Sequence, residues 1–164
     1  MSGVKSSGEG IAAILGAIDA LSKTEVLVGI PHGESRDGGM SNAEIGYLLE
    51  TGSPSMNLPP RPHLVPGVEE AQEIIGQQLT SAVDAALSGN TQRMHKHLES
   101  AGMKATMSVK RYITTGEFKT LAPWTINARK RRGKKSEKPL IDTGQMRNAH
   151  TYIIMSRGKE VGRA

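Results

Sequence analysis

The middle of the chain holds two long helical patterns joined by a very short break, and this pair constrains the fold most. Apolar residues recur at helical spacing across residues 67–87 and again across residues 92–114. Between them, Ser88, Gly89 and Asn90 interrupt the pattern, and Thr91 is placed to cap the second helix. Two helices of about 21 and 23 residues with so short a link predict an antiparallel hairpin.

The segments on either side of this hairpin predict a small sheet. Residues 10–22 carry a helical stripe, and residues 24–30 (TEVLVGI) are typical of a strand that is buried on at least one face. Short apolar strands are expected again at residues 139–141 and 151–155. The sequence therefore predicts an α+β fold, in which a small antiparallel or mixed sheet packs on the long antiparallel helical hairpin, with long polar loops.

The chain is expected to form a single domain over residues 1–164. Its core must be aliphatic, because it has one Phe, one Trp and three Tyr, against eight Met. Residues 1–9 are expected to be a flexible lead, and the polar, glycine-rich residues 156–164 a flexible tail. A sheet of three strands leaves exposed edges, which is one reason to expect a homo-oligomer.

Several functional classes are not expected. The chain has no cysteine, so disulfides and thiolate zinc sites are not available, which fits a reducing cytoplasm. No apolar run reaches the roughly 18 residues that span a bilayer, and the first ten residues lack the layout of a signal peptide. His95 and His97 lie on different sides of their helix and cannot share a metal. No phosphate-binding loop or nucleophile elbow is present. We therefore expect no catalytic residue, no metal and no cofactor.

A helix over residues 42–50 is predicted to lead into a proline-rich loop. Ser41 and Glu44 have the spacing of a capping box, and Gly52 ends the helix. Residues 51–66 contain five prolines, which exclude a regular helix or a central strand. Proline stiffness lowers the entropy cost of docking on a partner. The predicted contacts in this loop are Arg61, Pro62 and His63, with Arg61 the most expected to make a fixed contact.

A short helix opened by Pro123 leads into a basic run, residues 129–138, that carries much of the net charge of +5. Such a run can be a solvated loop, a surface for an acidic protein, or a contact for a phosphate backbone. The alternative function is therefore a small basic nucleic-acid-binding protein, although few aromatic residues are available for stacking on single-stranded bases. The predicted partner contacts of the run are Arg129, Arg131, Arg132, Lys134 and Lys135.

The turn formed by Asp142, Thr143 and Gly144 has two interpretations. As a structural turn, Asp142 or Thr143 caps a following helix, and Asp142 has capping-box spacing with Gln145. Residues 140–144 (LIDTG) also match the signature loop of retroviral-type aspartic proteases, where two such loops share a proton. A homodimer could supply the pair, but the 20 residues after Gly144 hold no flap and no second apolar strand containing glycine.

Two groups of motifs occur in a defined order along the chain. The first group is VLVGIP at residues 26–31, NAEIGYLLETG at residues 42–52 and LPPRPHL at residues 58–64. The second is LAPWTI, then ARK, then PLIDTGQMRN, within residues 121–148. In this order the motifs resemble those of tail-completion and head–tail joining proteins of tailed bacteriophages. Ala122 stands where that family often has a capping Ser or Thr, and the pair at residues 150–151 is His-Thr where Ser-Ile is commoner.

The resemblance implies a structural virion protein with no chemical step, no membrane and no small-molecule substrate. It implies a ring homo-oligomer, hexameric by expectation, that joins the tail tube to the head connector. Its neighbours would be tail-tube, tail-terminator or head-connector proteins in the virion neck, after assembly in the cytoplasm of the bacterial host. If genome DNA passes through the ring, the basic run is expected to face away from the lumen. Loops at residues 31–40, 51–66 and 129–138 are expected to order on binding neighbours.

Overall fold

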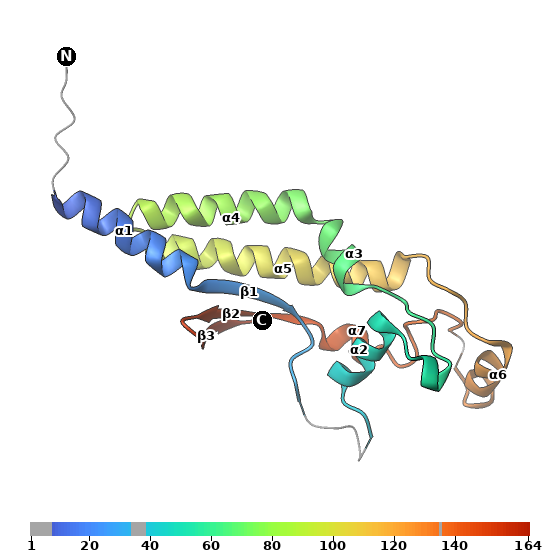
Figure 1. Cartoon of the computed structure of the whole chain (residues 1–164). Helices are drawn as coiled ribbons and strands as arrows, with labels where there is room; N and C mark the ends of the chain where they lie inside the picture. Colours follow the sequence, from blue (N-terminus) through green and yellow to red (C-terminus); the bar gives the residue numbers. More distant parts are fainter. Residues whose placement is uncertain (1–7, 34–38, 135) are drawn as a thin grey trace.

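The computed structural model describes residues 8–33, 39–134 and 136–164, and these residues form an α+β fold (Figure 1). Its described elements are seven α-helices, one 3₁₀ helix (η1) and a three-stranded antiparallel sheet. In chain order they are α1 (Gly8–Ser22), β1 (Thr24–Gly29), α2 (Asn42–Thr51), η1 (Pro54–Met56), α3 (Leu64–Glu69), α4 (Gln72–Leu87), α5 (Thr91–Thr115), α6 (Pro123–Arg131), α7 (Gln145–Ala149), β2 (Thr151–Ser156) and β3 (Lys159–Arg163).

The long helices α4 and α5 pack along each other, and the sheet lies against α5 (Figure 1). Asn90, not Thr91, caps α5, because its side chain accepts the N–H of Arg93 at 2.9 Å. The contact between α5 and the sheet is close at Gly102. A Cβ placed there would lie 2.5 Å from Cγ of Tyr152 on β2, so this position needs glycine.

The predicted helix over residues 67–87 is interrupted. The structure has a short helix α3 and then α4, with the break at Glu70 and Ala71. Helix α3 also starts inside the proline-rich segment, because Pro66 falls in its first turn, where proline is tolerated. The capping box of Ser41 and Glu44 on α2 is confirmed: the Ser41 Oγ accepts the N–H of Glu44 at 3.2 Å, and the Ser41 N–H donates to the Glu44 carboxylate at 2.7 Å.

In the sheet the order is β1-β2-β3, so β1 and β3 are its edges. Strand β1 pairs with β2 from Thr24 opposite Ser156 to Gly29 opposite Thr151. The prediction of a flexible tail at residues 156–164 is wrong, because β3 pairs with β2. The two strands turn at Arg157 and Gly158, which both have positive φ, as a tight hairpin turn requires.

A strand at residues 139–141 was also predicted, and this prediction is wrong: the segment is a turn without sheet pairing. Of the predicted flexible lead, residues 1–7 lie outside the described residues, while Gly8 and Glu9 belong to α1. Residues 34–38 of the predicted loop at 31–40, and Lys135 of the basic run, also lie outside them.

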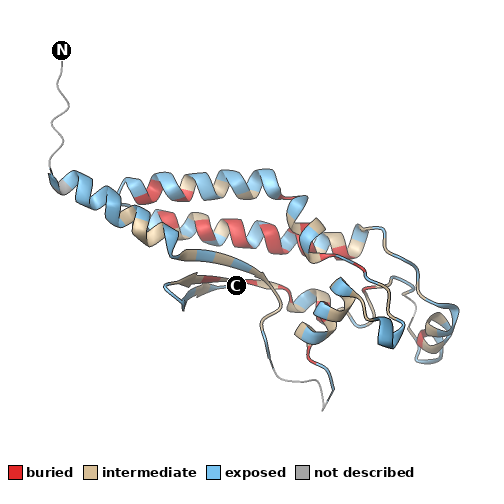
Figure 2. Cartoon of the chain, viewed as in Figure 1, coloured by how far each residue is buried: buried red, intermediate tan, exposed pale blue. Residues whose placement is uncertain are grey.

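The core consists of two clusters that α5 connects (Figure 2). The first joins alanines of α4 to Met94 and Leu98 of α5 and to Tyr152 and Ile154 of β2. The second joins Val109 and Ile113 of α5 to Leu140 and Met146. By contrast, most of α1 is exposed. The described helices include none with the length and apolarity that crossing a bilayer requires.

Candidate functional site

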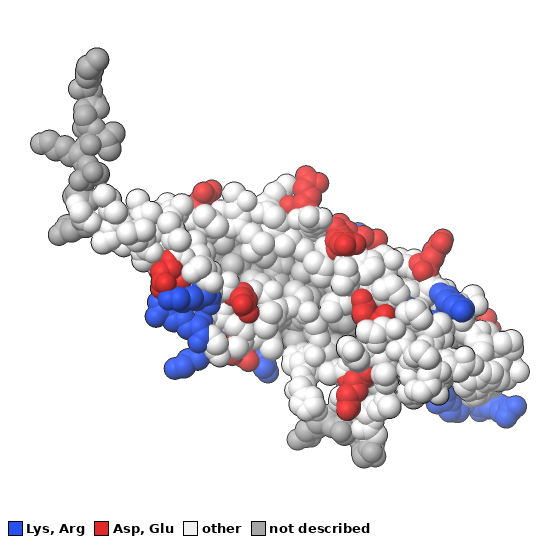
Figure 3. Space-filling view, in the orientation of Figure 1, with Lys and Arg blue, Asp and Glu red and all other residues white. Residues whose placement is uncertain are grey.

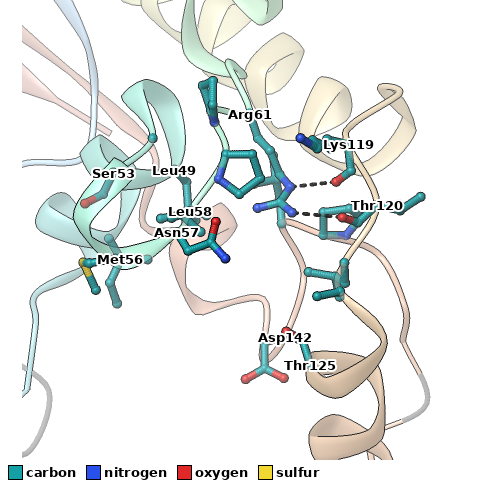
Figure 4. Close-up of a pocket in the computed structure, with 18 of the residues that line it drawn as sticks. Leu49, Ser53, Met56, Asn57, Leu58, Arg61, Lys119, Thr120, Thr125 and Asp142 are labelled. Atoms are coloured by element: carbon teal, nitrogen blue, oxygen red, sulfur yellow. Dashed lines mark hydrogen bonds between the residues drawn. The ribbon is translucent and has the colours of Figure 1, made fainter.

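A cavity of about 980 Å³ opens at the end of the molecule that holds α6 (Figure 1), and Figure 4 shows residues that line it. Three segments that are far apart in sequence line it: residues 51–61, residues 119–125 and residues 139–146. The first segment holds the proline-rich motif, and the last holds the Asp-Thr-Gly turn. Ile45 and Leu49 of α2 complete the wall. We call this cavity the groove.

The proline-rich wall of the groove is ordered by its own backbone. Gly52 has a φ of 75° and ends α2 by donating its N–H to the carbonyl of Leu48 at 2.8 Å. A Cβ at Gly52 would lie 2.8 Å from the nitrogen of Pro60, so glycine is required there. Ser53 and Leu58 exchange two backbone hydrogen bonds, of 2.8 and 2.9 Å, around the short helix η1. These backbone hydrogen bonds and the close packing at Gly52 therefore define the conformation of this wall.

Arg61 fastens this wall to the next one. Its side chain, 4% exposed, donates from Nε to the carbonyl of Lys119 at 2.8 Å and from Nη2 to the carbonyl of Thr120 at 3.2 Å (Figure 4). Burial, and then the like charge of Arg129, lower the pKa of the Arg61 guanidinium. The planar fork of the guanidinium suits two neighbouring carbonyls. Arg61 therefore holds residues 119–120, which belong to no helix or strand, against the proline-rich loop.

Arg129 fastens the third wall in the same way. It lies buried in α6 and donates from Nη1 to the carbonyls of Lys138 at 2.8 Å and Ile141 at 3.1 Å. Weaker bonds of 3.4 Å reach the carbonyls of Ser136 and Pro139. Because these carbonyls turn toward one guanidinium, residues 139–141 cannot offer them to a neighbouring strand. This is the physical reason that the predicted strand does not form.

These contacts correct three predicted partner residues. Arg61, His63 and Arg129 are buried and bonded within their own chain, so they do not face a partner. Pro62 is exposed. Arg61 and Arg129 do make fixed contacts, but within their own chain. Their partners are backbone carbonyls up to 59 positions away in the sequence, and local sequence patterns do not indicate such contacts.

Asp142 lies in the groove lining with its Oδ1 3.7 Å from Nε of Arg129. That oxygen is buried and has no hydrogen-bond partner in the described structure. In Figure 4 the carboxylate points away from Arg61. The capping prediction is wrong, since α7 starts after Gly144, which has a φ of 78°, and no side chain caps it. Thr143 Oγ1 accepts the N–H of Gln145 at a long 3.4 Å.

The lining of the groove is mostly apolar and carries one carboxylate, that of Asp142, among its described residues. A shared-proton dyad needs a second carboxylate, which would have to come from another copy. Trp124 and Met56 belong to the lining and are 74% and 56% exposed. Exposed aromatic and methionine side chains beside an apolar cavity are typical of a surface that binds another protein.

A second buried polar cluster lies between α2 and α7, and local sequence spacing gave no signal for it. The Glu50 carboxylate accepts the backbone N–H groups of His63 at 2.7 Å and Leu64 at 3.0 Å, and so caps α3. It also lies 2.9 Å from Nδ1 of His63. The His63 ring packs edge-on against the ring of His150, with centroids 5.4 Å apart. The residues that meet here come from positions 50, 63 and 150, so only the fold brings them together.

The basic run is less free than its sequence indicates. Besides buried Arg129, Lys130 pairs with Glu137 at 2.9 Å, and Lys138 donates to the carbonyl of Thr114 at 2.6 Å. Arg131 and Arg132 are exposed, and Lys134 is half-buried. Figure 3 shows basic side chains at opposite ends of this face of the molecule. The end away from α6 includes Arg157, which pairs with Asp19 of α1, and Lys159, both at the β2–β3 turn within the predicted flexible tail.

Within the described residues, no three His, Cys, Asp or Glu side chains are grouped as a metal site. His97 bonds Gln78 through Nδ1 at 3.0 Å, and His95 makes no described polar contact. Comparison of the chain with known protein families, curated proteins and solved structures found no match.

Proposed function

We propose that this chain is a structural virion protein of a tailed phage, a tail-completion or neck component that joins the tail tube to the head connector. The observation that carries the proposal is the convergence of motifs. Parts of both motif groups that resemble the phage family, which are widely separated in the sequence, line one groove. If the two motif groups serve to dock one partner, they must lie on the same surface, and the groove brings them together.

The groove would act by making contacts. The α4–α5 hairpin and the sheet would form the rigid body that presents it, and Trp124 and Met56 would anchor a segment of the neighbouring tail protein. Arg61 and Arg129 hold the three walls in place before any partner arrives. This lowers the entropy cost of binding, so the proline-rich wall needs no ordering on contact. A ring of copies, hexameric by expectation, would place several such grooves at the end of one tube.

The test is to mix purified protein with tail tubes of the phage and to count capped tube ends by electron microscopy. Wild-type protein should cap one end of the tubes. Trp124→Ala should raise the protein concentration needed to cap half of the tube ends by about 30-fold, the usual effect of losing a central aromatic anchor. Tyr47→Ala is the matched control, because Tyr47 of α2 is an aromatic residue that is 68% exposed and does not line the groove. The Tyr47→Ala variant should cap tube ends at the same concentration as wild type.

Protein that ignores tubes at every concentration would contradict the proposal. If such protein bound DNA with an affinity that fell steeply with salt, the nucleic-acid alternative would replace it. In that case Arg131→Glu and Arg132→Glu, both at exposed positions, should reduce the DNA affinity.

A further inference from the structure

Helix α1 projects from one end of the molecule, opposite the end that holds α6 (Figure 1). Between Gly10 and Ile18 it has no charged residue. A helix that is apolar on all sides is normally buried. Yet Ile11, Ile14, Leu15 and Ile18 are between 46% and 61% exposed.

The exposed part of α1 is held firmly by its C-terminal half. Ala17 and Leu21 pack against the first core cluster. Asp19 pairs with Lys23 at 2.5 Å and with Arg157 of the β2–β3 turn at 2.9 Å. The helix is therefore anchored to the sheet and presents its apolar first turns as a fixed surface.

Helix α4 packs beside α1 and also exposes apolar side chains. Leu79, Val83 and Leu87 follow one another at intervals of four, so they lie on one stripe, and they are 40–43% exposed. We call the seven exposed side chains of α1 and α4 the apolar patch. Together they leave on the order of 600 Å² of apolar surface in water, the upper end of what a monomer exposes as one patch.

We infer that the apolar patch is covered by a second copy of this chain. A standard interface buries roughly 800 Å² on each partner, and the patch supplies most of that area. A second copy brings a patch of the same size and character, so the two patches can cover each other. A membrane surface fits less well, because helices that lie on lipid carry Lys or Arg on the opposite face, and α1 has neither between Gly10 and Ile18.

This contact does not depend on the proposed function. The same patch on both copies gives a closed dimer, whereas α1 of one copy on α4 of the next gives a contact that can continue around a ring. Under the proposed function, it would be the contact between neighbouring subunits, at the end of each molecule away from the groove.

The experiment is the mass of the full-length chain by sedimentation over a range of concentrations. Wild type should form dimers or larger assemblies. Leu15→Glu should raise the dissociation constant about 30-fold or more, because it places a charge at the centre of the contact. Met107→Glu is the matched control, because Met107 of α5 is 60% exposed, as Leu15 is 61% exposed, and belongs neither to the apolar patch nor to the groove lining. It should keep the wild-type mass.

Cross-linking gives a second reading that does not depend on a disruptive variant. The chain has no cysteine, so Leu15→Cys introduces the only thiol. A short bis-maleimide should then link Leu15→Cys to itself in a closed dimer, or to Val83→Cys in a mixed sample if α1 of one copy meets α4 of the next. Met107→Cys should not be linked. Wild-type protein that is monomeric at all concentrations, or Leu15→Cys that is linked neither to itself nor to Val83→Cys, overturns the inference. If the patch assembles copies but tail tubes stay uncapped, the inference stands and the proposed function fails.

Discussion

His150 is almost fully buried, and burial is the main cause that lowers its pKa from 6.5 to about 4. The nearby His63 lowers the pKa further, and Lys110 adds a small effect in the same direction. Its Nδ1 donates to the carbonyl of Met146 at 3.0 Å, an interaction that favours the protonated ring but does not offset burial. In the folded protein at neutral pH, the ring is therefore neutral.

This pKa predicts a loss of stability in mild acid. The unfolded chain binds a proton at His150 with a pKa near 6.5, while the folded chain resists it until about pH 4. The contribution is fully present above pH 6.5 and is lost as the pH falls toward 4. Between pH 7 and pH 5, the free energy of unfolding should drop by about 2 kcal/mol from this residue.

Urea unfolding at the two pH values measures this drop. His150→Asn keeps a hydrogen-bond donor but cannot be protonated, so most of the drop should disappear. His95→Asn is the control, because His95 is partly exposed and has no described partner. Equal pH dependence in wild type and His150→Asn would show that another group is responsible.

The same cluster shows what a sequence can predict for single residues. The capping box of Ser41 and Glu44 was predicted correctly because both residues lie within one turn. The cap on α3 was missed because Glu50 reaches it from 13 positions away. Arg61 was expected to make a fixed contact, but not with carbonyls of its own chain. Polar contacts between residues far apart in the sequence depend on the complete fold, so they cannot be predicted from local residue spacing.

At the scale of elements, two glycines in the long helices have opposite surroundings. Gly102 of α5 faces Tyr152, and an added Cβ would lie 2.5 Å from the ring. Gly76 of α4 is exposed, and nothing lies within 4 Å of its added Cβ. Gly102→Ala should lower the free energy of unfolding by about 1–3 kcal/mol through overpacking. Gly76→Ala should raise it by up to about 1 kcal/mol through helix propensity.

Chemical unfolding of the two variants beside wild type tests the pair, and each variant serves as the control for the other. If both variants raised the free energy of unfolding, helix propensity would outweigh the close contact between α5 and β2. The comparison isolates that contact, because both substitutions are identical in chemistry and both lie in helix interiors.

The elements themselves were predictable where periodicity extends over several turns or a full strand. Helices α1, α4 and α5 and strands β1 and β2 all lie where the patterns indicated. Short segments were less predictable, as β3 and residues 139–141 show. Strand β3 has only Val161 as a large apolar residue, so its alternation is too weak to see. Residues 139–141 look like a strand, but their carbonyls bind Arg129.

At the scale of the whole molecule, the two ends differ in how they are held (Figure 2). Helix α5 buries nine of its residues, while α6 buries only Arg129 among its described residues. Leu140 and Met146 tie the groove end to the second core cluster, but residues 119–120 and α6 are held by two guanidinium groups that bind loop carbonyls. It should therefore open locally without unfolding the α4–α5 hairpin.

Hydrogen exchange tests this difference. Backbone amides of α6 should exchange at least about 100-fold faster than the buried amides of α5. Arg61→Lys keeps the charge but cannot donate to two carbonyls at once as the guanidinium does. The amide exchange rates at residues 118–122 should therefore rise further in this variant. Arg131→Lys, at an exposed position of α6, should leave those rates unchanged. If α6 exchanged as slowly as α5, the two ends would unfold as one unit.

The pairing of β1 with β2 sets an order of events during synthesis. Residue 24 leaves the ribosome long before residue 156, its partner in the sheet. Throughout that interval α4 and α5 can form their local contacts, but β1 has no strand beside it. Its apolar side chains and unpaired edge are then open to chaperones and to other nascent chains. Slowing translation downstream of α5 should therefore lengthen the period in which this protein is prone to aggregate.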